Sequence, residues 1–146
     1  MTYLLDVNLL IALAWPSHVH HTIAQEWFRD NRRAGWSTCP VTQIGFVRIS
    51  SNPKFIDGAV APGEAIALLR QVTTARDHTF WPDNFDVATS DEIPPTLLLG
   101  HRQVTDAYLL GLAIHCQGKL ATLDNGITAL LPSAEARSKY LEILKI

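Results

Sequence analysis

Residues 101–124 read HRQVTDAYLLGLAIHCQGKLATLD, a stretch that combines a helical pattern, a strand pattern and two aspartates. Apolar residues recur at helical spacing over residues 105–116, which predicts a helix there. Gly118 follows the last turn, where glycine is expected to supply the left-handed cap of the helix. Residues 119–123 (KLATL) then predict a short, mostly buried strand that ends at a turn signal.

Carboxylates lie where these predicted elements meet. Asp106 falls in the first turn of the helix, and Asp124 comes directly after the strand. The amino terminus repeats the pattern, because residues 2–5 predict a strand, Asp6 ends it, and residues 7–14 predict an apolar helix. Functional groups of an open parallel sheet gather beyond the carboxyl ends of its strands. We therefore expect the three aspartates to meet at one edge of a sheet.

Three carboxylates that meet in this way repel one another, by about 1 kcal/mol for each pair about 4 Å apart in water. A bound cation relieves such repulsion, and hard carboxylate oxygens suit Mg²⁺ or Mn²⁺. The residue pattern therefore predicts a divalent-metal site with Asp6, Asp106 and Asp124 as ligands.

The same segments resemble the PIN-domain ribonucleases. The resemblance is carried by Leu5-Asp-Val-Asn8, by His101 to Leu109 (HRQVTDAYL) and by Ala121-Thr-Leu-Asp124, and it is strongest to the VapC-type toxins of toxin–antitoxin pairs. It extends over nearly the whole chain. It implies an α/β protein with a three-layer α/β/α fold and a central, mostly parallel sheet of four to five strands. It further implies a metal-dependent endoribonuclease that cuts RNA, is held inactive by a small antitoxin, and forms a homodimer.

The chain departs from the resembled pattern at one catalytic position. The family normally has a glutamate there as a fourth acidic residue, whereas this chain has Gln43. A neutral amide can offer a carbonyl oxygen but brings no charge and is a poor base, so we expect weaker metal binding or an altered metal preference. Replacement of the missing charge by Asp91 or Glu92 is disfavoured, because residues 89–95 predict a solvated loop.

Six further polar residues are predicted around the acidic site. Those that would hydrogen-bond a carboxylate or a metal-bound water are Asn8, Thr42 and Thr105. Those that would contact substrate phosphates are Arg48, His101 and Arg102. For Arg48, contact with a phosphate or an antitoxin carboxylate and an ordinary place on a helix surface are equally consistent with the sequence. For His101 and Arg102, substrate contact is favoured over a solvated surface.

The remaining segments predict further helices and strands. Helices are expected over residues 19–33, 41–51 and 62–75 and shortly after Asp124, and strands over residues 36–39, 78–81 and, at a sheet edge, 140–146. Residues 83–100 are expected to be irregular.

Composition bounds the class of protein. A chain of 146 residues fits one domain over residues 1–146, and 47% hydrophobic and 18% charged residues indicate a globular protein. No apolar run reaches a membrane span and no signal peptide begins the chain, so we expect a cytoplasmic protein. The net charge of −2 argues against a broadly basic nucleic-acid binder but leaves local phosphate contacts possible.

Cysteine and histidine usage points away from other metal sites. Cys39 and Cys116 are interpreted as buried thiols of a reducing compartment, because their spacing is not that of metal ligands. His18, His20 and His21 are interpreted as helix-entry and surface residues rather than zinc ligands, which would lie three or four positions apart on a helix.

Two other functions stay open at this level. One is a catalytically inactive PIN-like module that binds RNA or an antitoxin, which Gln43 would explain. The other is a receiver-like signalling domain, which would need a pair of acids after the first strand and an aspartate after the middle strand. The sequence offers one acid at the first place and Cys39-Pro40 at the second.

Overall fold

A computed structural model describes residues 1–146, apart from the side chain of Thr96. Its centre is a five-stranded sheet in the order β3-β2-β1-β4-β5, and all neighbouring strands are parallel. The strands are β1 (Tyr3–Leu5), β2 (Trp36–Thr38), β3 (His78–Phe80), β4 (Lys119–Thr122) and β5 (Leu141–Ile143).

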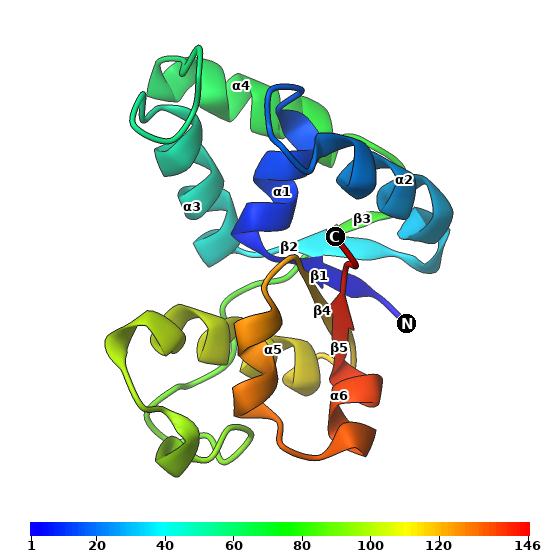
Figure 1. Ribbon diagram of the computed structural model, residues 1–146, viewed down its shortest axis with the longest axis vertical. Helices are drawn as coiled ribbons and strands as arrows, with labels where there is room; N and C mark the ends of the chain where they lie inside the picture. The colour runs from blue at the N-terminus through cyan, green and yellow to red at the C-terminus, as the bar shows by residue number, and fades with distance from the viewer.

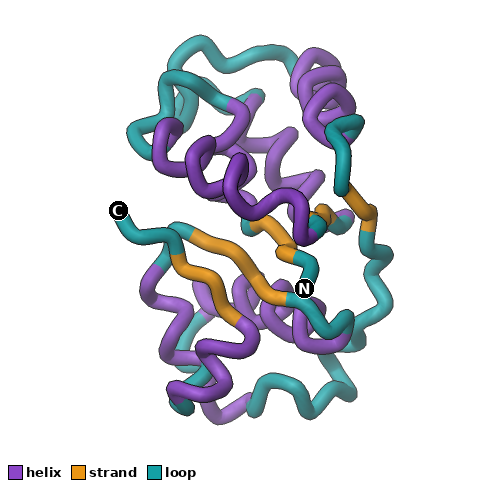
Figure 2. The backbone as a smooth tube through the Cα atoms, turned by 90° about the vertical axis from the view of Figure 1, so that its right-hand side faces the viewer, coloured by secondary structure: helices purple, strands orange, loops and turns teal.

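Helices cover both faces of this sheet. One face carries α1 (Val7–Ala14), α2 (His21–Asn31), α3 (Pro40–Ser50) and α4 (Pro62–Thr73), and the other carries α5 (Val104–His115) and α6 (Ala134–Tyr140) (Figures 1 and 2). Short 3₁₀ helices lie at Arg32–Ala34, Pro95–Leu97, His101–Gln103 and Asn125–Leu130. The predicted three-layer α/β/α fold with a parallel central sheet is therefore confirmed.

The strands are short, and alternate residues pack into two separate cores. Leu4 and Leu120 lie in the core beneath α5, whereas Leu5 and Ala121 lie in the core beneath α1. A strand covered on both faces must be apolar at successive positions, which is why Leu4-Leu5 of β1 and Leu120-Ala121 of β4 are consecutive apolar residues rather than alternating ones.

The end of α5 differs from the expectation. The left-handed residue is Gln117, with φ of 59°, and not Gly118. The helix ends one residue earlier than the glycine cap requires, with Cys116 as its C-cap. Gly118 is needed for space instead, because a Cβ there would lie 2.6 Å from the carbonyl oxygen of Thr2 and 2.7 Å from the ring of Trp81.

The carboxyl-terminal segment was only partly predicted. β5 is an edge strand as expected, but it covers Leu141–Ile143 alone. The preceding α6 (Ala134–Tyr140) was not predicted, because its sequence AEARSKY has no apolar stripe and the helix contains no fully buried residue. Ser133 begins it by accepting a hydrogen bond from the Ala136 backbone N–H at 3.3 Å.

Among the residues that the structure describes, no helix combines the length and the apolar character that crossing a membrane requires.

Candidate active site

The three predicted aspartates come from three elements that adjoin one another. Asp6 follows β1 and begins α1, and Asp124 follows β4. Since β1 and β4 are parallel neighbours, with Leu5 opposite Ala121, both aspartates leave the sheet at the same edge. Asp106 lies in the first turn of α5, which packs against β1 and β4.

Asp6 is buried, with 5% of its surface exposed, and both of its carboxylate oxygens accept hydrogen bonds. The Val7 backbone N–H donates to Oδ1 at 2.7 Å, and the Thr122 hydroxyl donates to Oδ2 at 2.7 Å. Burial raises the pKa of Asp6 and the charge of Asp124 adds to this rise, while the hydrogen bonds from Thr122 and Val7 act to lower it. The start of a helix also favours a negative charge at this position.

The charges of Asp6 and Asp124 both affect the carboxyl group of Asp106. Burial raises its pKa to about 6, and the charges of Asp6 and Asp124 contribute to the rise. The structure thus brings the three predicted aspartates within electrostatic reach of one another. A carboxyl group whose pKa is raised by burial and by like charges together is typical of a functional site.

Thr122 connects two of these aspartates and was missed as a site residue. Besides donating to Asp6, its Oγ1 accepts a hydrogen bond from the Asp124 backbone N–H at 3.1 Å. Asp124 is itself exposed, and its Oδ1 accepts from the Gly126 backbone N–H at 2.8 Å. A buried threonine at a strand end, two residues before the aspartate, was the available signal.

Gln43 lies in the first turn of α3, as predicted, but its amide nitrogen is already engaged. Nε2 donates to Thr38 Oγ1 at 3.0 Å, and the same hydroxyl lies 2.8 Å from His78 Nε2. Burial lowers the pKa of His78, which favours the neutral ring. The amide is therefore held at the end of β2, in a short hydrogen-bonded chain that reaches β3.

Thr42 does not take the predicted role beside the carboxylates. It is fully buried, and its hydroxyl accepts from the Cys39 backbone N–H at 3.0 Å and donates to the Cys39 carbonyl at 3.1 Å. Proline at the first position of α3 and cysteine before it leave that helix without a strong side-chain cap, and Thr42 closes its first turn.

Four of the predicted residues line one cavity of about 550 Å³ between α1 and α3. They are Asp6, Asn8, Arg48 and Thr105. Asn8 also lines a second hollow of about 300 Å³ that contains Asp124. His101 and Arg102 are exposed in the turn before α5 and line neither cavity. Asp91 and Glu92 are likewise exposed and line neither.

Comparison with known proteins gives the family. Ribonuclease VapC39 of Mycobacterium tuberculosis is 46% identical over 136 residues, which cover 93% of this chain and 96% of the relative. Ribonuclease VapC38 of the same species is 44% identical over 144 residues, covering 98% of each chain. The chain belongs to the VapC ribonuclease family. No protein-family model matches it.

A solved VapC-type structure has the same fold. The crystal structure of VapBC2 from Rickettsia felis, bound to a DNA fragment from their promoter, contains a chain that superposes with a TM-score of 0.66. The superposition covers 99% of this chain and all of the other, at 11% identity. Identity this low shows the shared fold and does not transfer individual residues.

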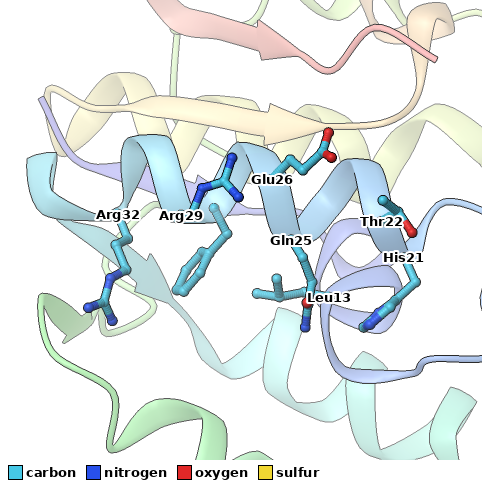
Figure 3. A pocket seen from close by; sticks show the side chains of 8 residues that line it. Leu13, His21, Thr22, Gln25, Glu26, Arg29 and Arg32 are labelled. Carbon is cyan, nitrogen blue, oxygen red and sulfur yellow. The ribbon is translucent and has the colours of Figure 1, made fainter.

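A further cavity of about 450 Å³ lies along α2 in this VapC-family chain (Figure 3). Leu13 of α1 and α2 residues including His21 and Glu26 line it, with Arg29 and Arg32 toward the end of the helix. It contains none of the three aspartates and mixes both signs of charge, so it does not compete as the catalytic site.

Two histidines near the start of α2 make hydrogen-bonding contacts within the fold. His18 Nδ1 accepts a hydrogen bond from the His20 backbone N–H at 3.0 Å, and His21 Nδ1 lies 2.8 Å from the Ala12 carbonyl oxygen. Both cysteines are free thiols, with Cys39 buried and Cys116 only partly so.

The donor chemistry of the three aspartates fits a hard divalent cation. In the part of the chain that the structure describes, no three His, Cys, Asp or Glu side chains stand close enough to form a ready-made metal cluster. However, burial raises the pKa of Asp106, and the charges of Asp6 and Asp124 add to that rise, so repulsion acts among the three carboxylates. A Mg²⁺ or Mn²⁺ ion would offset that repulsion and draw the carboxylates together.

Proposed function

We propose that this VapC-family chain is a metal-dependent endoribonuclease that hydrolyses RNA phosphodiester bonds as the toxin of a toxin–antitoxin pair. The observation that carries the proposal is the Asp6–Asp106–Asp124 group, in which burial and the two neighbouring charges raise the pKa of Asp106 to about 6. The naming of the relatives as ribonucleases supports the choice of RNA as substrate.

Asp6, Asp106 and Asp124 would hold Mg²⁺ or Mn²⁺. When bound, the metal would activate a water molecule and offset the negative charge of the phosphodiester. The chain's own residues would set the geometry: Thr122 holds the Asp6 carboxylate in place, and the start of α1 orients it. Residues that orient a ligand in this way commonly affect metal affinity or activity about 10- to 100-fold.

Cavity residues would position the RNA. Arg48 is exposed, lines the same cavity as Asp6 and would contact a phosphate. Asn8 and Thr105 line the same cavity and would hydrogen-bond the substrate or a bound water. His101 and Arg102 would approach the RNA only at a longer range, as exposed positive or polar groups before α5.

Assignment as a toxin of this family also implies its protein partners and its cellular compartment. A small antitoxin would bind the chain and keep it inactive, as the association of VapB and VapC in the similar Rickettsia felis complex suggests. The protein would act as a homodimer in the cytoplasm, where two free thiols are stable.

A second candidate function is an inactive module that binds RNA or the antitoxin without cutting. It is favoured by Gln43, whose amide donates to Thr38, and by the exposed acids Asp91 and Glu92, which line neither cavity. The two functions differ in their need for metal, because an inactive module has no use for tight Mg²⁺ or Mn²⁺ binding.

Cleavage of total cellular RNA by the purified protein separates the two functions. The assay compares Mg²⁺, Mn²⁺ and EDTA, with Asp106→Asn as the site variant and Asp91→Asn as a control of equal charge change in the exposed loop. We expect cutting by the wild type and by Asp91→Asn, and none with EDTA or in Asp106→Asn. If folded wild-type protein neither cuts RNA nor binds Mn²⁺ by calorimetry, the inactive module is the correct assignment.

A further inference from the structure

Three hollows are linked by lining residues that they share, and two of them border the turn that follows α3. The cavity of about 550 Å³ that contains Asp6 and the hollow of about 210 Å³ beside Lys54 share Phe55. The latter shares His18 with the hollow of about 300 Å³ that contains Asp124. We name these three hollows together the Phe55 groove; Asp6 lines one of them and Asp124 lines another.

Phe55 is held outward on an ordered turn. Its side chain is 71% exposed, whereas that of the next residue, Ile56, is 5% exposed and packs in the core beneath α1. The turn is closed by hydrogen bonds to Asn52: its carbonyl accepts from the backbone N–H groups of Phe55 at 3.0 Å and Ile56 at 3.1 Å, and its Oδ1 accepts from the Lys54 backbone N–H at 3.0 Å. The aromatic ring is thus presented to solvent by a rigid support.

The surroundings of Phe55 match the parts of a nucleotide. Ile44, 61% exposed, adds a second apolar surface in the same cavity. Arg48 and Lys54 are exposed cations that line two different hollows, each of which Phe55 also lines, while Asn8 and Asn52 offer amide donors and acceptors. Grooves for single-stranded nucleic acid combine such cations for the phosphates with an aromatic ring on which a base stacks.

We propose that Phe55 is a stacking platform for an unpaired base of the RNA substrate, with Arg48 and Lys54 contacting the phosphates on its two sides. This rests on the proposed function, because it supplies the path by which RNA reaches the aspartates. An RNA occupant is favoured over a protein segment because the groove joins an exposed aromatic ring, flanking cations and a site for cutting phosphodiesters. The site would accordingly select unpaired RNA over a duplex.

The test measures RNA binding without cleavage. Wild-type protein in EDTA is titrated into a fluorescent single-stranded RNA of random sequence and about 12 nucleotides, a length within the range such grooves occupy. A backbone of the same length that lacks bases is the second probe. The variants are Phe55→Ala, Phe55→Trp and, as the matched control, Phe80→Ala, which removes another exposed phenylalanine from edge strand β3.

Phe55→Ala, which lacks the stacking contact, should bind the base-containing RNA about 10-fold more weakly than wild type. Phe55→Trp should restore it, Phe80→Ala should leave it unchanged, and the base-free probe should bind wild type and Phe55→Ala equally. Equal RNA affinity of wild type and Phe55→Ala would overturn the proposal, as would a weakening that is the same for both probes. A change of molecular mass in Phe55→Ala on gel filtration, with RNA affinity unchanged, would assign the ring to a protein contact instead.

These outcomes are separate from those of the cleavage assay. Wild-type protein that cuts RNA with Mn²⁺ while Phe55→Ala binds RNA normally would leave the nuclease assignment intact and remove the stacking platform. Base-dependent binding through Phe55 by a protein that does not cut would support the platform and overturn the nuclease.

Discussion

Thr122 donates its hydroxyl hydrogen to Asp6 Oδ2 at 2.7 Å, although 116 positions separate the two residues. Because the same hydroxyl accepts from the Asp124 backbone N–H, it fixes Asp6 at the end of β1 relative to Asp124 at the end of β4. The acidic site is therefore supported from within the sheet, in addition to the hydrogen bond that Asp6 accepts from the Val7 backbone N–H at the start of α1.

Thr122→Val tests this support with a side chain of nearly the same shape. We expect Mn²⁺ affinity and RNA cleavage to fall about 10- to 100-fold, because Asp6 loses the group that orients it. The melting temperature should also fall, by an amount equivalent to about 1–3 kcal/mol for a buried polar group left with fewer partners. Thr122→Ser should restore both, and Thr79→Val, at an exposed strand position, should change neither. Normal metal binding by Thr122→Val would show that Thr122 does not orient Asp6 for the metal.

Asp106→Asn should stabilise the metal-free protein in a pH-dependent way. The pKa of Asp106 is raised from 3.8 to about 6, so between these values the folded state binds more protons than the unfolded state. Stability from this group is therefore present below about pH 4 and lost as the pH rises through about 6.

The gain of Asp106→Asn over wild type should accordingly be near zero at about pH 4 and largest above about pH 7. We expect about 1 kcal/mol there, after discounting for solvent screening of a half-exposed carboxylate. This corresponds to a rise of about 2–4 °C in melting temperature, measured by differential scanning calorimetry in EDTA. A gain that does not change with pH would show that the charge of Asp106 is not the cause.

Gln43→Glu introduces a negative charge at the position where the resemblance to the PIN-domain ribonucleases implies a glutamate. We expect Mn²⁺ to bind about tenfold more tightly, equivalent to about 1.4 kcal/mol, because a fourth carboxylate joins the site. The Thr38 hydroxyl can donate to the new carboxylate if His78 Nε2 becomes the donor in turn, so the fold should tolerate the change. Gln25→Glu, exposed on α2, carries the same charge change and should not alter affinity. Unchanged binding by Gln43→Glu would place that side chain away from the ion.

Gly45 lets α3 approach α1 beside Asp6. A Cβ at this position would lie 2.8 Å from Val7 Cγ2, so Gly45→Ala should destabilise the protein by about 1–3 kcal/mol through overpacking. Adding Val7→Ala should recover part of that loss. Gly63→Ala is the matched control, because nothing lies within 4 Å of the place that its methyl group would take and alanine favours a helix, so it should stabilise by about 0.5–1 kcal/mol. Thermal unfolding measures all three, and equal effects at both glycines would contradict the close approach.

Much of the fold was predictable because it depends on local patterns. Apolar runs bounded by turn signals marked the five strands and most of the helices, and the helix that escaped detection, α6, has no apolar stripe to reveal it. The three aspartates were predictable for a related reason: each stands at a strand end or in a first helical turn, which the sequence shows directly.

Hydrophobic periodicity and capping act over a few neighbouring residues, so most elements, and the carboxylates at their ends, can be read from the amino-acid sequence. Which side chains meet depends instead on how the elements pack. The strand order places β4 beside β1 and so joins Thr122 to Asp6, α3 lies where Gln43 reaches Thr38, and Ile56 is buried while Phe55 faces outward. These pairings depend on how both cores pack across the sheet, and that packing joins residues far apart in the chain.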